Sequence, residues 1–188
     1  MSWTDKLYGS EKPTLVRAFI FSIFYVSIIL WLYGWWADFI PSSKWKNSGI
    51  YLSVFLSAIY CPALYFLAAT QKPMIKIFKS YIGRILQFCF IAIVMTFIFW
   101  GVIVHGAAGL LTQAVGKPIT IKAELWKTSI ASRRGCDFRL EGDAIQRAMP
   151  SYICITESFY SELPTHQAFK LEGKRSYLGF HIKKIDTE

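Results

Sequence analysis

Three long stretches of this chain contain no charged side chain: residues 18–37, 47–71 and 85–116. About 20 apolar helical residues span the ~30 Å hydrocarbon core of a bilayer, so each stretch is long enough to cross a membrane. A soluble protein with buried helices is the alternative, but buried soluble helices rarely stay free of charge for so long. The sequence therefore predicts a polytopic membrane protein.

The predicted fold class is membrane α + β, with three transmembrane helices followed by a small C-terminal antiparallel β-sandwich or barrel-like domain. We expect the helices at about residues 17–40, 49–70 and 82–104, within a membrane domain that covers residues 1–116. An extracytoplasmic β domain would then cover residues 117–188. The aromatic content of 17% is ordinary for a membrane protein.

The distribution of Lys and Arg predicts how the chain threads the membrane. The N-terminal segment and residues 72–84 together carry seven Lys and Arg, whereas the loop after the first helix carries only Lys44 and Lys46. Positive charges in short loops stay on the cytoplasmic side. We therefore expect a multi-pass inner-membrane protein with a cytoplasmic N-terminus and a periplasmic C-terminal domain, although a eukaryotic secretory membrane fits the same threading.

The expected helices are poor in groups that could carry ions. No Asp, Glu, Lys or Arg lies in the middle of them, whereas ion and proton pathways usually need buried ionisable groups. Pro62 lies inside the second helix and is expected to kink it, because it frees the carbonyl of Ala58. A hinge and simple packing are both open interpretations of this proline. Gly101, Gly106 and Gly109 could allow close helix contact, although their spacing is not GxxxG.

From Pro118 onward, apolar and polar residues alternate, which is typical of half-buried strands. We expect about five short strands in this region, with the strand at residues 152–159 in the centre because it is apolar on both faces. Cys136 and Cys154 both fall in this domain, and in an oxidising compartment they form a natural disulfide worth about 3 kcal/mol. Two reduced cysteines are the alternative, and no zinc site is expected because the histidines lack ligand-pair spacing.

No catalytic, cofactor-binding or metal site is predicted, because the chain contains no phosphate-binding loop, zinc-protease or dinucleotide-binding motif. Nucleic acid is not an expected partner, since the basic residues do not gather on one predicted surface. Two basic pairs are candidates for contact with a lipid headgroup or an acidic protein partner: Arg133 with Arg134, and Lys174 with Arg175. Solvated loops are the alternative interpretation of both pairs.

These observations favour a non-catalytic integral inner-membrane protein whose periplasmic β domain binds a protein partner. It would be an accessory subunit of an envelope complex, or an immunity or exclusion protein. The alternative is an oligomeric channel or transporter subunit, with hydroxyl groups of the helices facing inward: Ser22, Ser27, Ser53, Ser57 and Thr96. A membrane-bound enzyme is a third class, for which no acid–base pair or metal set is found. Membrane lipids and either a protein partner or a second copy of the chain are the expected partners.

Overall fold

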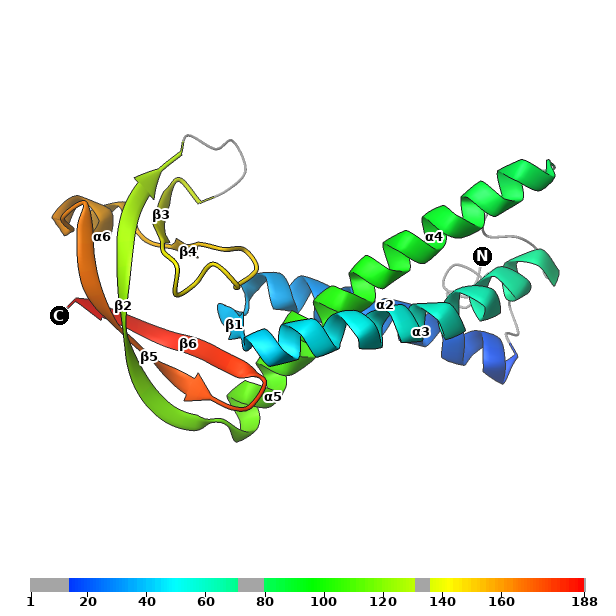
Figure 1. Cartoon of the computed structure of the whole chain (residues 1–188), viewed down its shortest axis with the longest axis horizontal. Coiled ribbons are helices and arrows are strands. Elements are labelled where there is room, and N and C mark those ends of the chain that lie inside the picture. The colour runs from blue at the N-terminus through cyan, green and yellow to red at the C-terminus, as the bar shows by residue number, and fades with distance from the viewer. Residues whose placement is uncertain (1–13, 71–79, 131–135, 188) are drawn as a thin grey trace, which may run out of the picture. The chain divides into compact units, whose positions relative to one another are not determined.

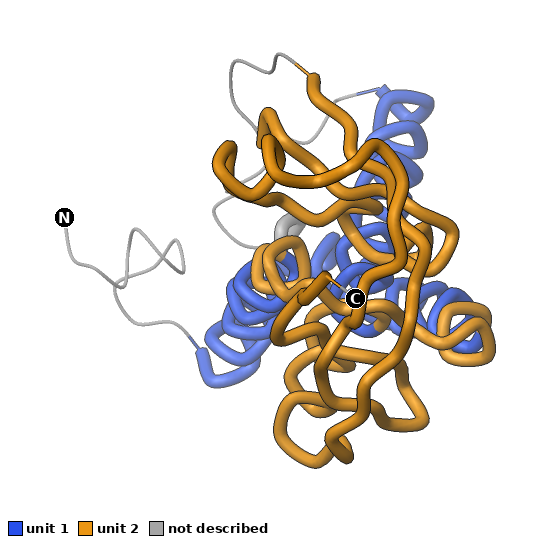
Figure 2. The backbone as a smooth tube through the Cα atoms, turned by 90° about the vertical axis from the view of Figure 1, so that its left-hand side faces the viewer, with its two compact units in different colours: residues 1–31, 48–103 blue, residues 32–47, 104–188 orange. Residues whose placement is uncertain are grey.

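The computed structural model describes residues 14–70, 80–130 and 136–187, which form long helices and one sheet (Figure 1). The chain divides into two compact units (Figure 2). Unit 1 comprises residues 1–31 and 48–103, and unit 2 comprises residues 32–47 and 104–188. Each unit has its own core of buried apolar side chains. The expected boundary between a membrane domain and a β domain at residue 116 stays a prediction.

Three helices in the described part of the chain are long and apolar enough to cross a membrane, as the sequence predicts. They are α2 (Leu15–Trp36), α3 (Ser43–Thr70) and α4 (Tyr81–Gly101). Helix α4 continues through a π-helical turn, η1 (Val102–Ala107), into α5 (Ala108–Val115). Helix α2 ends earlier than expected because the chain turns into a strand, β1 (Phe39–Pro41). The chain stays helical on both sides of Pro62, and the kink expected there stays a prediction.

The core of unit 1 joins all three helices through aromatic packing and backbone hydrogen bonds. Tyr60 of α3 packs edge-on against Phe99 of α4, with ring centroids 5.4 Å apart, and its hydroxyl donates to the Ile20 carbonyl of α2 at 2.7 Å. The Ser57 hydroxyl of α3 donates to the Ala92 carbonyl of α4 at 3.1 Å. These bonds bring polar groups together inside an apolar core, where an unpaired polar group would be costly.

The β domain forms one curled antiparallel sheet, a half-barrel, rather than a two-sheet sandwich (Figure 1). The strand order is β1-β6-β5-β2-β3-β4. Besides β1, the strands are β2 (Lys117–Ser129), β3 (Phe138–Glu141), β4 (Ile153–Cys154), β5 (His166–Arg175) and β6 (Gly179–Thr187). The longest strand, β2, pairs with both β5 and β3 and so connects the two halves of the curled sheet.

The prediction of a long central strand at residues 152–159 is wrong. Only Ile153 and Cys154 are in a strand, β4, and it lies at the edge of the sheet. A short helix, α6 (Glu157–Glu162), follows because Thr156 acts as its N-cap, its hydroxyl accepting from the Phe159 N–H at 3.4 Å. Local capping therefore overrides the apolar pattern that favours a strand.

The disulfide expected from the sequence is present and joins Cys136 to Cys154, with Cα atoms 5.6 Å apart. It ties the short edge strand β4 to the segment that leads into β3. The core beneath the sheet is fully apolar at its centre, where Leu125, Leu140 and Leu171 have no exposed surface. A small core of this kind gains from a covalent link, because the core alone gives little stability.

Replacing both Cys136 and Cys154 with Ser should lower the free energy of unfolding of the β domain by about 3 kcal/mol, because the reduced chain gains loop entropy. Thermal unfolding of the full chain in detergent, followed by near-ultraviolet circular dichroism, measures the change. Cys89→Ser is the matched control, since Cys89 is a free and exposed cysteine. An unchanged melting temperature in the double variant would contradict the prediction.

Gly101 of α4 lies against Trp31 of α2. A Cβ atom added at Gly101 would overlap the ring of Trp31. That ring is held in place by edge-on packing against Phe97, with ring centroids 6.0 Å apart. Gly101→Val should therefore destabilise unit 1 by about 1–3 kcal/mol through overpacking. Thermal aggregation in detergent measures this, and Leu86→Phe on the exposed face of α4 is the control. Equal melting temperatures for the two variants would count against the close contact.

Candidate functional site

Strand β4, at one edge of the half-barrel, and β6, next to the short edge strand β1, line a common groove in unit 2, which we call the seam groove. It has a volume of about 430 Å³. One side comes from β4 and the start of α6, and the other from β6. Its lining residues are Asp38, Ile153, Cys154, Ile155, Thr156, Phe159, Ile182, Lys183, Lys184 and Ile185. The groove therefore occupies the place where further strands would close the sheet into a barrel.

Strand β6 has an unpaired edge along this groove. One edge of β6 pairs with β5 from Arg175 back to Phe169. The other edge pairs with β1 only at Gly179–His181, and the Ile182 N–H then donates to the Asp38 carbonyl at 3.1 Å. Beyond that bond, no strand among the described residues covers the second edge of β6. Its remaining backbone groups are therefore available to an added strand.

The lining of the seam groove has both apolar and polar surface. Five of its side chains are large and apolar: Ile153, Ile155, Phe159, Ile182 and Ile185. Lys184, which also lines the groove, forms an ion pair with Asp186 at 2.7 Å. An exposed strand edge beside apolar pockets is the arrangement by which β-sheet proteins bind extended peptides, with backbone bonds for affinity and pockets for specificity.

Asp38 lines the seam groove where β1 meets β6, and His181 of β6 pairs with the neighbouring Phe39. Asp38 has a φ of 41°, a left-handed conformation that Asp tolerates better than most residues. Burial raises the pKa of Asp38, and the His181 charge opposes this shift. Burial lowers the pKa of His181, with Asp38 opposing and Lys183 adding to the shift. The buried Nδ1 atom of His181 has no hydrogen-bond partner among the described residues.

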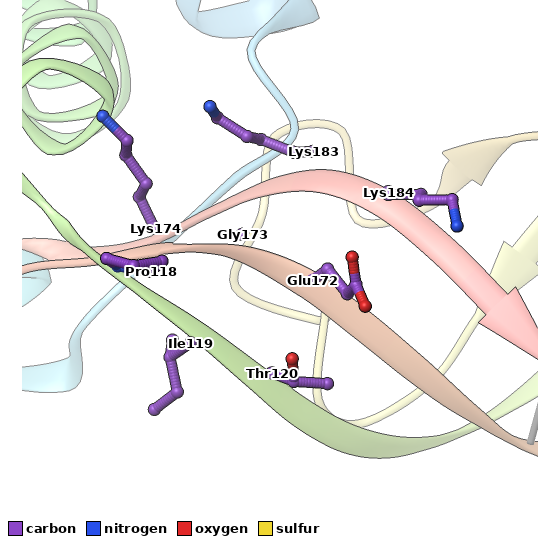
Figure 3. A pocket seen from close by; sticks show the side chains of 8 residues that line it. All are labelled: Pro118, Ile119, Thr120, Glu172, Gly173, Lys174, Lys183 and Lys184. Atoms are coloured by element: carbon purple, nitrogen blue, oxygen red, sulfur yellow. The ribbon is translucent and has the colours of Figure 1, made fainter.

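A second groove of about 490 Å³ lies over strands β2, β5 and β6 (Figure 3). Its charged residues are of mixed sign, with Glu172 among lysines. Lys174, a candidate contact residue from the sequence, donates to the Gln113 carbonyl of α5 at 2.7 Å. This bond places a cation at the C-terminal end of a helix, which favours positive charge. A contact between Lys174 and a partner or lipid stays a prediction.

The structure describes only one of the other three predicted contact residues, Arg175. Arg133 and Arg134 lie outside the described residues. Arg175 lines a third pocket together with Lys44 and Arg147, which are not among the predicted contact residues. Arg147 follows β3 by only a few residues, and its place beside Arg175 comes from the sheet topology, which no local motif reveals.

Within the described residues, no group of three His, Cys, Asp or Glu side chains is close enough to hold a metal ion. His166 and Glu124 approach each other at 3.9 Å on adjacent strands, and both side chains are exposed. Such a pair lacks the buried, oriented third group that activated nucleophiles and bases need. The expectation of a non-catalytic protein stays a prediction.

No protein-family model matches the chain, and no curated protein or solved structure matches it at a significant level. Its function must therefore be inferred from the fold and the chemistry of its surfaces. Of these surfaces, the seam groove combines an unpaired strand edge with several apolar side chains.

Acidification should destabilise the β domain through His181. Burial lowers the pKa of His181 in the folded state below its ordinary value of 6.5. As the pH falls below 6.5, the unfolded chain therefore binds a proton at His181 more readily than the folded chain does. The stabilising contribution is present above pH 6.5 and is lost as the pH falls from there toward the folded-state pKa. Melting temperatures between about pH 7.5 and pH 5 should fall in the wild type, with a smaller fall in His181→Gln.

Asp38→Asn is the informative control for this prediction. The raised pKa of Asp38 acts in the opposite direction, since it favours the folded state as the carboxyl becomes protonated at low pH. The variant should therefore keep the acid-induced fall in melting temperature. An identical pH profile for wild type and His181→Gln would rule out His181 as the source.

Proposed function

We propose that this chain is a non-catalytic, multi-pass inner-membrane protein whose β domain lies in the periplasm and binds a protein partner. The three long apolar helices support membrane insertion. The excess of Lys and Arg before the first and third helices supports a cytoplasmic N-terminus. The Cys136–Cys154 disulfide is typical of an oxidising compartment, which supports an exported β domain.

One observation carries the binding role: the unpaired edge of β6 beside the apolar side chains of the seam groove. Sheet proteins usually protect such edges, since an open edge is a template for pairing with another chain. Here the edge borders Ile155, Phe159 and Ile185, which offer pockets for alternate side chains of an added strand. The proposed partner therefore contributes an extended segment. This partner would be another subunit of an envelope complex or, for an exclusion protein, a component of the system that it blocks.

The alternative of an oligomeric channel has weaker support. A channel needs polar groups that face a pathway. The hydroxyls of Ser53, Ser57 and Thr96 instead donate to backbone carbonyls of α3 and α4. Helix–helix and helix–backbone bonds are the common use of such groups in membrane helices. This alternative also predicts a defined homo-oligomer in detergent, which the binding role does not need.

A photoreactive residue in the seam groove tests the binding role in living cells. At Thr156, which lines the groove, it should form a discrete adduct with the partner. At Thr120, an exposed threonine of β2 outside the seam groove, it should not. Adding Ile185→Arg to the Thr156 probe should remove the adduct, because a long cation would occupy the seam groove.

Folding of each variant is checked by disulfide formation and by its melting temperature. Equal labelling from Thr156 and Thr120, or no adduct from Thr156 under several growth conditions, would contradict the seam groove as the binding site. Labelling of Cys154 after reduction, with a reagent that does not cross the inner membrane, tests the periplasmic placement separately, since Cys154 is exposed. A protected Cys154 would contradict that placement.

A further inference from the structure

The third pocket in unit 2, which we call the basic pocket, is lined by three cationic side chains. It has a volume of about 610 Å³. Its lining residues are Ile40, Pro41, Ser42, Ser43, Lys44, Ile121, Ala144, Arg147, Arg175, Ser176, Tyr177, Gly179 and Phe180. Lys, Arg and hydroxyl groups are present in this set, and no carboxylate is. The composition is that of an anion site.

Hydrogen bonds hold the start of α3 against the β5–β6 turn and so shape the pocket. The Ser42 N–H donates to the Leu178 carbonyl at 2.8 Å, and the Ser42 hydroxyl donates to the Tyr177 carbonyl at 3.1 Å. The same hydroxyl oxygen accepts from the Trp45 N–H at 3.2 Å, which makes Ser42 the N-cap of α3. These bonds place Lys44, in the first turn of α3, near Arg175 at the end of β5.

Arg147 completes the cationic lining from a third element. It lies in a turn stabilised by the Ala148 N–H, which donates to the Ile145 carbonyl at 2.8 Å. Its guanidinium donates to the Ser43 hydroxyl at the start of α3. The other guanidinium N–H groups of Arg147 make no further side-chain bond within the described residues. They are thus available to a ligand.

The positive charge of the basic pocket is not balanced within the described residues. Lys44, Arg147 and Arg175 form no ion pair with a described carboxylate. The first turn of α3 contains no acidic residue, and its N–H groups add the positive end of the helix dipole. Guanidinium groups bind phosphate through two parallel hydrogen bonds, so two arginines, a lysine and serine hydroxyls match a phosphate group.

We propose that the basic pocket binds the phosphate of an anionic phospholipid headgroup. This inference rests on the proposed membrane insertion, because Ser43 begins a helix that would enter the bilayer from its outer face. Tyr177, which lines the pocket, is 73% exposed. Trp36, which precedes the pocket residue Ile40 in the sequence by four positions, is 77% exposed. Trp and Tyr with this exposure are typical of the headgroup level of a membrane.

The test measures retention of phosphatidylglycerol by the full chain. The wild type is reconstituted in phosphatidylcholine nanodiscs with increasing phosphatidylglycerol, and the lipids it keeps after release into detergent are counted by native mass spectrometry. Arg147→Gln with Arg175→Gln should weaken phosphatidylglycerol retention about 30-fold, because each cation near a membrane surface contributes about 1 kcal/mol. Both arginines are exposed, so the variant is expected to fold.

The matched control is Lys122→Gln with Lys170→Gln, which removes two cations that face each other on β2 and β5 away from the pocket. It should keep wild-type retention. Equal retention by both double variants, with the protein still resistant to carbonate extraction, would overturn the lipid site alone. Release of the wild type by carbonate would instead overturn the proposed membrane insertion and the inference with it.

Inorganic phosphate separates a lipid headgroup from a free anion. In nanodiscs that contain phosphatidylglycerol, phosphate at millimolar concentration should change the melting temperature of the wild type little, because headgroups held in the membrane are expected to occupy the site. A large stabilisation by phosphate in the wild type, lost in the arginine double variant and without a preference for phosphatidylglycerol, would overturn the lipid assignment.

Discussion

The pairing of three residues, Phe39–Pro41, with β6 is the interaction on which the architecture of unit 2 depends. This strand is the connection between α2 and α3, and the pairing makes a loop between two helices into an edge of the sheet. Phe39 is almost fully buried, and a Cβ atom added at Gly109 of α5 would lie 3.5 Å from its side chain. A Cβ atom at Gly179 would clash with the Ile40 carbonyl, so the close approach of β1 to β6 requires glycine there. One short strand therefore joins the ends of the helices to the β domain.

The shortness of β1 also leaves the seam groove open. A longer first strand would pair with all of β6 and would extend the sheet toward β4. Instead, the left-handed Asp38 ends the pairing after the Ile182 N–H bond, and α2 ends two residues earlier. The positive φ of Asp38 turns the chain away from β6, and the rest of that strand edge is unpaired. The strand edge that we propose as a binding site is thus open because α2 ends only a few residues before β1 and leaves β1 short.

The sequence predicts the helices well because lipid imposes a strong rule on composition. A stretch such as residues 18–37 without one charge has few alternatives to a membrane-spanning helix. The disulfide is also predictable, since Cys136 and Cys154 are the two cysteines outside the apolar stretches. The period-2 pattern finds β2 and β6, but it fails at residues 152–159. There the N-cap at Thr156 starts a helix that an apolar pattern does not reveal.

The candidate sites are less predictable because each is assembled from distant segments. Arg175 is visible in the sequence as half of a basic pair, but its neighbours Lys44 and Arg147 are more than 100 and about 30 residues away from it in the chain. Strand β1 could not be found by alternation, since Phe39, Ile40 and Pro41 are all buried and are too few to show a period. A sequence pattern reports local structure, whereas these pockets depend on which strands pair.

The seam groove and the basic pocket share β1, which affects how their roles can be separated. Asp38 lines the seam groove, while Ile40 and Pro41 line the basic pocket. A substitution within β1 would therefore disturb both surfaces and could not assign a loss of binding to either. Substitutions at Arg147 and Ile185 lie on different elements and touch one surface each. If the basic pocket holds a headgroup phosphate, it would fix β1 and the β5–β6 turn at the membrane surface, because both segments line it. The open edge of β6 would then be presented to a partner from a sheet anchored at one end.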